Sequence, residues 1–226
     1  MLVNELFCSI DGEGKRAGEL TAFIRFCGCN CNCSYCDSRY TWSETGKEMT
    51  PEEIFDWVVD TGYVNVTITG GEPLLQKDLS KLVTMLAENG NDVNIETNGT
   101  LDPVSVLGNI FYHDNVFVTM DYKCESSGQR DKMIFENFIC LRPKDVLKFV
   151  VGNKQEMEHA LSFINELSSY LAYYEQFNPI IYFSPIFGKI QPSEIVEFMK
   201  EKHLVKRVRA QLQLHKYFWN PEERGV

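Results

Sequence analysis

The chain has 226 residues, of which 44% are hydrophobic and 12% aromatic. That is enough to bury one substantial core, so we expect a single domain over residues 1–226. The formal net charge of -10 argues against nucleic-acid binding, which usually needs a basic surface. No run approaches the roughly 18 apolar residues of a membrane helix, and the first residues lack the pattern of a secretory signal. We therefore expect a cytoplasmic protein with a small-molecule or protein partner.

The predicted elements begin with an extended segment at residues 3–10, a glycine-rich turn and a strand at residues 20–28. A helix is expected at residues 50–62, because Thr50 can cap it and Glu53 completes a capping box. Strands and helices then alternate. The further strands are expected at 64–70, 92–99, 116–122, 145–152, 180–185 and 208–214, and the helices at 78–90, 154–175 and 193–203. This order predicts an α/β fold of parallel βαβ units, either an open doubly wound sheet or an incomplete barrel.

Polar or glycine-rich turns follow four successive predicted strands. They are the cysteine-rich run at 27–36, TGGEP at 69–73, ETNGT at 96–100 and DYK at 121–123. Each alone could be an ordinary turn. Because ligands bind beyond the carboxyl ends of parallel strands, the four together predict one shared site.

The run CGCNCNCSYC holds five of the eight cysteines. Thiols stay reduced in the cytosol, so a metal site is favoured over disulfides. Four-thiolate sites usually have a second C-x2-C pair, and none is present here. Only Cys29, Cys33 and Cys36 give the spacing C-x3-C-x2-C. The run therefore predicts a three-cysteine site.

Cys27 and Cys31 are extra to this triad. A zinc site that uses either of them as a fourth ligand stays an alternative. Cys27 falls on the same strand face as Phe23 and Arg25, so it is expected to point toward the site without binding metal.

The triad, with Tyr35 before its last cysteine and TGGEP downstream, resembles the signature of the radical S-adenosylmethionine enzymes. The resemblance implies that three thiolates hold a 4Fe-4S cluster and leave the fourth iron for the amino and carboxylate groups of S-adenosylmethionine. Cleavage of that cofactor supplies a 5'-deoxyadenosyl radical, so the protein's tasks are placement and protection.

Longer segments resemble the 7-carboxy-7-deazaguanine synthase family of queuosine biosynthesis: NELFCSIDGEG, GELTAFIRFCGCN, CSYCDSRYTW, VTITGGEP, IETNGT and QLHKYFWN. The resemblance implies radical ring contraction of 6-carboxy-5,6,7,8-tetrahydropterin to 7-carboxy-7-deazaguanine with loss of ammonia. It also implies a magnesium ion, a homodimer and a modified, incomplete (β/α)6 TIM-type barrel with a mostly parallel sheet.

The resemblance also assigns cofactor contacts to residues of this chain. The S-adenosylmethionine contacts are expected from Tyr35, Cys36, Asp37, Gly71, Glu72, Asp121, Tyr122 and Lys123. The family usually has Ser-Pro-Lys at the last three of these positions, so only Lys123 is retained. Ser38 stands where a threonine hydroxyl usually binds magnesium, and serine keeps that oxygen.

The substrate contacts implied by the resemblance are Ile10, Asp11, Gly12, Glu13, Arg25, Thr69, His215 and Val226. The forked donors of Arg25 suit a carboxylate, and Glu13 suits the pterin N–H groups. Asp11 replaces a frequent glutamine and cannot donate a hydrogen bond. His215 is either a substrate contact or a simple neighbour in the last predicted strand.

Two other classes stay open. A glycyl-radical enzyme activase shares the cysteine spacing and acts on a protein partner, whereas a non-catalytic iron-sulfur or zinc module leaves the glycine-rich turns unexplained. The basic run KRVR at 206–209 is most simply a solvated face. A weaker hypothesis makes it the docking site of an acidic electron donor such as flavodoxin.

Overall fold

The computed structural model describes residues 1–42, 45–171, 179–205 and 208–226. These residues form a nine-stranded sheet in the order β3-β1-β2-β4-β5-β6-β7-β8-β9. The strands are β1 (Leu2–Ile10), β2 (Leu20–Phe26), β3 (Lys47–Glu48), β4 (Asn65–Gly70), β5 (Asp92–Thr97), β6 (Val116–Tyr122), β7 (Val146–Val151), β8 (Ile180–Pro185) and β9 (Val208–Ala210). Neighbours from β2 to β9 are parallel, and β1 is antiparallel to both β2 and β3.

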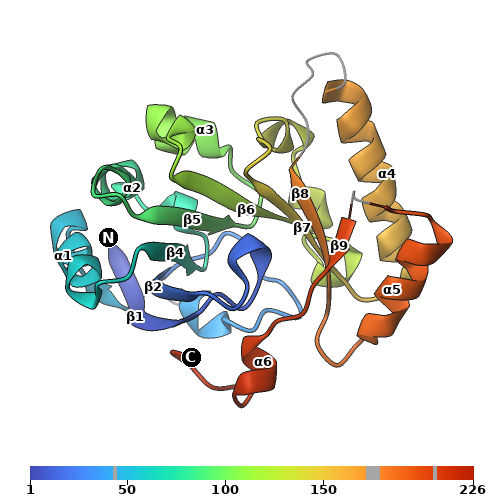
Figure 1. The fold of residues 1–226 in the computed structure, drawn as a ribbon, viewed down its shortest axis with the longest axis horizontal. Coiled ribbons are helices and arrows are strands. Elements are labelled where there is room, and N and C mark those ends of the chain that lie inside the picture. Colours follow the sequence, from blue (N-terminus) through green and yellow to red (C-terminus); the bar gives the residue numbers. More distant parts are fainter. Residues whose placement is uncertain (43–44, 172–178, 206–207) are drawn as a thin grey trace.

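Except for the last and shortest one, the described helices cover this curved sheet on its outer side (Figure 1). They are α1 (Pro51–Thr61), α2 (Leu79–Glu88), α3 (Pro103–Leu107), α4 (Lys154–Leu171), α5 (Pro192–Glu201) and the short α6 (His215–Phe218). In the part of the chain that the structure describes, β3 and β9 are the two sheet edges and do not pair with each other. The predicted incomplete TIM-type barrel is confirmed.

Local sequence signals explain where α1 begins and ends. The Thr50 side chain accepts a hydrogen bond from the Glu53 backbone N–H at 3.2 Å, and the Glu53 carboxylate accepts one from the Thr50 N–H at 2.8 Å. Gly62 ends the helix with a left-handed φ of 71°, which glycine adopts without steric cost. The predicted capping box is therefore present, and such a cap stabilises a helix by about 1 kcal/mol.

The main core lies between the sheet and the outer helices. Ile24, Ile68 and Ile95 come from three adjacent strands and are completely buried against residues such as Ile54 and Leu82 of the helices. Parallel strands covered by helices read as apolar runs for this reason. Truncation of one such side chain to alanine would cost roughly 2–5 kcal/mol of unfolding free energy.

The chain departs from the predicted elements after β9. The strand expected at 208–214 ends at Ala210, and His215 begins α6 instead of continuing a strand. Gln211 accepts a hydrogen bond from the Gly14 N–H at 2.9 Å, and the Leu214 N–H donates to the Gly12 carbonyl at 2.9 Å. The last segment leaves the sheet because it binds the glycine-rich turn after β1.

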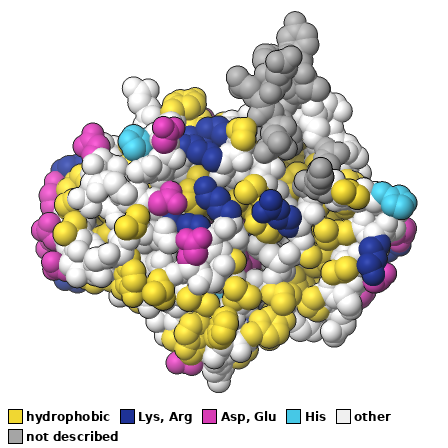
Figure 2. Space-filling view, in the orientation of Figure 1, with side chains coloured by type: hydrophobic (Ala, Val, Ile, Leu, Met, Phe, Trp, Pro, Cys, Tyr) yellow, Lys and Arg dark blue, Asp and Glu magenta, His cyan; other side chains and the backbone are white. Residues whose placement is uncertain are grey.

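Two predicted features fall partly on residues outside the described ones. The helix expected at 154–175 is described to residue 171, and residues 206 and 207 of the basic run are likewise not described. Among the described helices, none is long and apolar enough to cross a membrane. Hydrophobic side chains gather in the lower part of Figure 2. Tyr217 and Phe218 of α6 are among the exposed large hydrophobic residues.

Candidate active site

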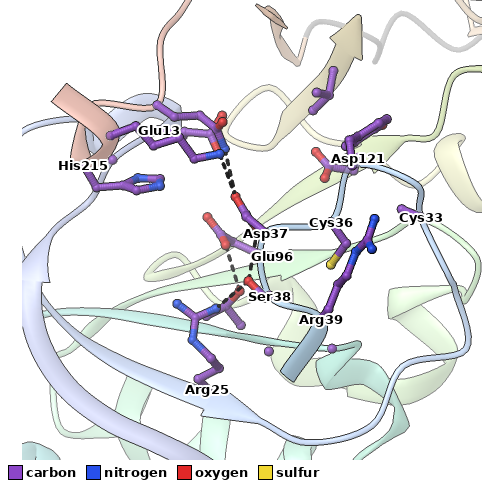
Figure 3. Close-up of a pocket in the computed structure, with 18 of the residues that line it drawn as sticks. Glu13, Arg25, Cys33, Cys36, Asp37, Ser38, Arg39, Glu96, Asp121 and His215 are labelled. Carbon is purple, nitrogen blue, oxygen red and sulfur yellow. Dashed lines mark hydrogen bonds and ion pairs between the residues drawn. The ribbon is translucent and has the colours of Figure 1, made fainter. Parts of the chain in front are cut away.

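A cavity of about 760 Å³ opens at the carboxyl ends of the parallel strands. The turns after β2, β4, β5 and β6 all contribute to its wall, as expected for one shared site. Its volume lies in the range of about 300–1,000 Å³ that ligand sites occupy. Figure 3 shows side chains from the start, the middle and the end of the chain converging on it.

The cysteine triad lies in this wall. Cys29, Cys33 and Cys36 line the cavity, together with Cys31, and all are free thiols. The segment after β6 supports their loop, because the Ser34 N–H donates to the Ser127 carbonyl at 3.0 Å. The segment after β6 therefore forms part of the site's support.

Cys27 was expected to point toward the site, but its side chain does not reach the cavity. Its thiol is buried on the other side and donates to the Thr45 carbonyl at 2.9 Å. A Cβ on Gly46 would lie 2.6 Å from this sulfur, so the loop packs closely around it. The strand alternation that predicted the opposite direction ends at Phe26, the last residue of β2.

The triad fits an iron-sulfur cluster by the chemistry of its donors. Hydrogen bonding with the Cys31 thiol lowers the pKa of Cys29 to about 6 and the pKa of Cys33 to about 7, which favours thiolates at these two positions, whereas burial raises the pKa of Cys36. Thiolate is the ligand that iron-sulfur clusters take. No three His, Cys, Asp or Glu side chains within the described ranges surround a point as a single-ion site requires. A multi-iron cluster holds its thiolates farther apart than one ion does.

The glycine-rich turn after β4 approaches the cysteine loop closely. A Cβ on Gly71 would lie 1.9 Å from the Gly28 carbonyl oxygen, and one on Gly70 would lie 2.3 Å from that of Phe26. Side chains are therefore excluded at both positions. The Glu72 N–H also donates to the Gly28 carbonyl at 2.8 Å, which ties the two turns together.

Glu72 supports the cavity from behind. Its side chain is completely buried and is not part of the cavity wall. The carboxylate accepts hydrogen bonds from the Thr97 hydroxyl at 2.8 Å, the Asn98 N–H at 2.7 Å and the Leu74 N–H at 3.1 Å. It thus joins the TGGEP turn to the ETNGT turn instead of facing a ligand.

The side chains of the DYK segment point in two directions, toward the cavity and toward the core. Asp121 and Lys123 line the cavity and form an ion pair at 2.8 Å. Tyr122 alternates to the opposite side of β6, where its ring packs against Phe163 and Phe149 at centroid distances of 4.3 and 5.3 Å. The structure therefore does not bring the Tyr122 side chain to the cavity.

A residue of the cavity wall also carries a buried hydroxyl. Tyr35 lines the wall, and its hydroxyl oxygen has no hydrogen-bond partner among the described residues. A buried polar group without a partner costs free energy unless a ligand or water satisfies it. Together with the glycine-rich turn at Gly70 and Gly71, this hydroxyl fits a polar cofactor such as S-adenosylmethionine beside the triad.

Most of the predicted substrate contacts meet on another part of the wall. The residues that line it are Ile10, Gly12, Glu13, Arg25, Thr69, His215 and Val226. They come from the end of β1 and the turn after it, from β2, β4 and α6, and from the C-terminal end, as Figure 3 shows for Glu13, Arg25 and His215. The structure thus gathers seven of the eight predicted substrate residues.

Asp11 is the exception. Its carboxylate is buried and accepts hydrogen bonds from the Arg16 Nε and the Thr67 hydroxyl, both at 2.8 Å. Its backbone N–H and carbonyl bind Glu19 and Gly18, also at 2.8 Å. The structure therefore does not bring Asp11 to the cavity, either through the side chain or through the backbone.

Ser38 lies between cationic and anionic groups. Its hydroxyl is 3.5 Å from Arg25 Nη1 and donates to Asp37 Oδ1 at 3.1 Å. The other Asp37 oxygen is 3.1 Å from Lys216 Nζ and accepts a hydrogen bond from Gln213 at 3.3 Å. Ser38 and Asp37 supply two hard oxygen ligands, so a divalent ion there would need the rest from substrate and water.

Several cavity residues were missed from the sequence. Lys148, Lys216 and Arg224 line the wall, and so does Glu96, whose turn at 96–100 was predicted to belong to the site without a separate role for this carboxylate. Burial raises the pKa of Glu96, which accepts a hydrogen bond from Thr69 at 2.9 Å. Lys148 had a detectable signal, because it is the only charged residue in the apolar strand VLKFVV. A lone charge in such a strand marks a position that needs a buried partner.

The open barrel and the three-cysteine cavity define a radical S-adenosylmethionine enzyme, and comparison with known proteins agrees. The model of the Radical SAM superfamily matches residues 23–118. The structure of QueE from Escherichia coli aligns with a TM-score of 0.67 and 24% identity, over 93% of this chain and 92% of that one. At this identity the likeness shows the fold alone.

Sequence relatives narrow the class. The 7-carboxy-7-deazaguanine synthase of Clostridium acetobutylicum is 42% identical over 99% of this chain and 98% of its own length. That of Chlorobaculum tepidum is 36% identical over 99% and 96%. The chain belongs to the 7-carboxy-7-deazaguanine synthase family.

Proposed function

We propose that the chain converts 6-carboxy-5,6,7,8-tetrahydropterin to 7-carboxy-7-deazaguanine with loss of ammonia. One observation carries the proposal: the cysteine triad and seven residues matching the family's substrate positions line the same cavity. When bound, the cluster and S-adenosylmethionine supply the radical that abstracts hydrogen. The chain's own residues bind and orient the pterin and keep water away.

Arg25 is suited to hold the substrate carboxylate. Its Nε is paired with Glu5 at 3.2 Å, which fixes the guanidinium and leaves its terminal nitrogens on the cavity side. A guanidinium binds a carboxylate through two parallel hydrogen bonds, and this sets orientation as well as affinity. Glu13 and His215 offer an acceptor and an imidazole to the pterin edge.

The proposal includes a magnesium ion at Ser38. Arg25 and Lys216 already place positive charge near this hydroxyl, so an ion would bind there together with the anionic substrate and not before it. Oxygen ligands from serine, substrate and water suit magnesium. The ion would then fix the substrate carboxylate beside Ser38.

The remaining parts of the proposal concern partners. We infer a cytoplasmic reaction, where thiols stay reduced, an acidic electron donor such as flavodoxin, and a homodimer. Reversal of the basic charges at 206–209 tests the donor through the rate of cluster reduction, and light scattering of the purified protein tests the dimer. Unchanged reduction kinetics or a monomeric mass would reject the corresponding part.

Anaerobic reconstitution tests the central reaction. The protein is loaded with iron and sulfide, reduced, and assayed for S-adenosylmethionine cleavage with and without the carboxypterin. Formation of 7-carboxy-7-deazaguanine that requires the pterin is expected. Cleavage that needs a protein partner would instead favour an activase, and absence of cleavage from a fully loaded cluster would contradict both.

A further inference from the structure

Lys148 lies between the two ligand-facing parts of the cavity. It is on β7, its side chain is 8% exposed, and its ammonium nitrogen is 3.2 Å from Glu13 Oε2 and 3.1 Å from Asp121 Oδ1. Glu13 belongs to the wall expected to meet the pterin, and Asp121 to the wall expected to meet S-adenosylmethionine. One buried cation therefore contacts a carboxylate of each wall.

Both carboxylates are held by further donors. Glu13 Oε1 accepts hydrogen bonds from the Ser184 hydroxyl at 3.0 Å and from Gln211 Nε2 at 3.2 Å. Asp121 Oδ2 accepts one from Lys123 at 2.8 Å. Glu13 thus has donors on both oxygens, from β7, β8 and the segment after β9. Its position depends on strands that follow it by more than 130 residues in the chain.

The charge on Lys148 persists despite its burial. Burial alone lowers the pKa of this lysine, but Asp121, Glu13 and Glu96 raise it well above the ordinary 10.5. A buried cation is tolerated only when it is paired, and removal of one partner leaves an uncompensated charge. Without Lys148, the carboxylates of Glu13, Asp121 and Glu96 would face one another with less compensation.

We propose that Lys148 is a positioning residue that fixes Glu13 for the pterin and Asp121 for S-adenosylmethionine at the same time. This inference rests on the proposed function and deepens it. A residue that served one wall alone would affect one ligand, whereas Lys148 is shared and affects both. In this proposal its contribution acts through the two carboxylates that it pairs with.

Equilibrium binding measured without turnover tests the inference. The full chain is reconstituted with its cluster, no reductant is added, and the affinities for S-adenosylmethionine and for the carboxypterin are measured separately by calorimetry. For K148M we expect both affinities to fall at least about tenfold, because the variant loses the charged hydrogen bond to Glu13 and the ion pair with Asp121. E13Q is expected to weaken only pterin binding, and D121N only S-adenosylmethionine binding.

Two further variants separate positioning from a general loss of structure. K148R keeps the cation and should fall between wild type and K148M for both ligands, and it carries the test if K148M does not fold. Lys202 pairs with Glu158 at 2.7 Å on the surface of α5, so K202M is the matched control and should leave both affinities unchanged. In the K148M background, E13Q should lower the affinity for the pterin only slightly further, because Glu13 has already lost its contact with Lys148.

The outcomes are distinct. Affinities of K148M within about twofold of wild type, or a loss of affinity confined to one ligand, would overturn the role of Lys148. So would a full additional loss on adding E13Q to K148M. If the loaded wild-type protein neither binds nor converts the pterin, the proposed function fails and this inference falls with it. If wild type converts the pterin while the lysine variant binds both ligands normally, only the inference fails.

Discussion

A Cβ atom on residue 12 would lie 2.5 Å from Nδ1 of His215, so the imidazole occupies the space that a side chain at Gly12 would need. The Leu214 N–H donates to the Gly12 carbonyl at 2.9 Å and holds α6 against the turn after β1. Glycine at this position therefore determines where the imidazole lies in the cavity.

Replacement of Gly12 by alanine should displace His215 and weaken pterin binding roughly tenfold, with the fold retained, because non-bonded atoms cannot remain at this distance. Calorimetric titration of the loaded, oxidised protein measures the effect. H215A supplies the control: the G12A change should add little to it, since the clashing ring is gone. Equal losses from G12A in both backgrounds would contradict this relationship.

The pKa of His215 predicts a pH dependence of stability. Burial lowers this pKa from its ordinary 6.5, so the unfolded chain takes up a proton at higher pH than the folded chain does. The contribution of His215 to the free energy of unfolding is therefore present above pH 6.5 and decreases as the pH falls through the lowered value. The free energy of unfolding is measured with urea for wild type and H215N at pH 7 and pH 5. Between pH 7 and pH 5, wild type should lose more of this free energy than H215N does. Parallel changes in the two proteins would count against it.

Serine replacements separate the cluster ligands from their neighbours. C29S, C33S and C36S should each reduce the iron content to near background after reconstitution, because a cluster needs all three thiolates. C27S should keep the iron, since its thiol binds the Thr45 carbonyl outside the cavity. We also expect C31S to keep it, although the Cys31 thiol hydrogen-bonds to Cys29 and Cys33. Loss of iron from C27S or C31S would revise the triad.

Ser38 provides a test for magnesium. S38A removes the hydroxyl oxygen and should abolish the increase in product formation when magnesium is restored to the chelated enzyme. S38T keeps the oxygen and should respond like wild type. The assay compares turnover before and after chelation and after addition of magnesium. Identical turnover of wild type under all three conditions would reject a magnesium requirement.

The C-terminal residues form one side of the cavity. Residues 221–226 line it, and the Arg224 guanidinium carbon lies 3.8 Å from the centre of the Tyr40 ring. A cation over an aromatic face contributes about 0.5–2 kcal/mol, so R224A should raise the KM for the pterin several-fold. R224K keeps the charge without the planar stack and should be intermediate. Removal of residues 222–226 should raise the KM further, and an unchanged KM would show that these residues do not contribute to pterin binding.

The sequence by itself determined those features that depend on local spacing. The spacing of Cys29, Cys33 and Cys36 singled out the triad. Strand and helix periodicity predicted parallel βαβ units, and the family resemblance then favoured an incomplete barrel over an open doubly wound sheet. The Thr50 capping box predicted the start of α1. These signals can be read because neighbouring residues and repeating patterns set them directly.

Only the tertiary structure decided which of the predicted side chains reach the cavity. Tyr122 faces the core, Asp11 is held by Arg16, and Glu72 supports the turns from behind. Lys148 meets Glu13 across 135 residues of sequence. The direction of a side chain at a strand end and the partner of a buried charge depend on strand register and long-range packing, which no local pattern records.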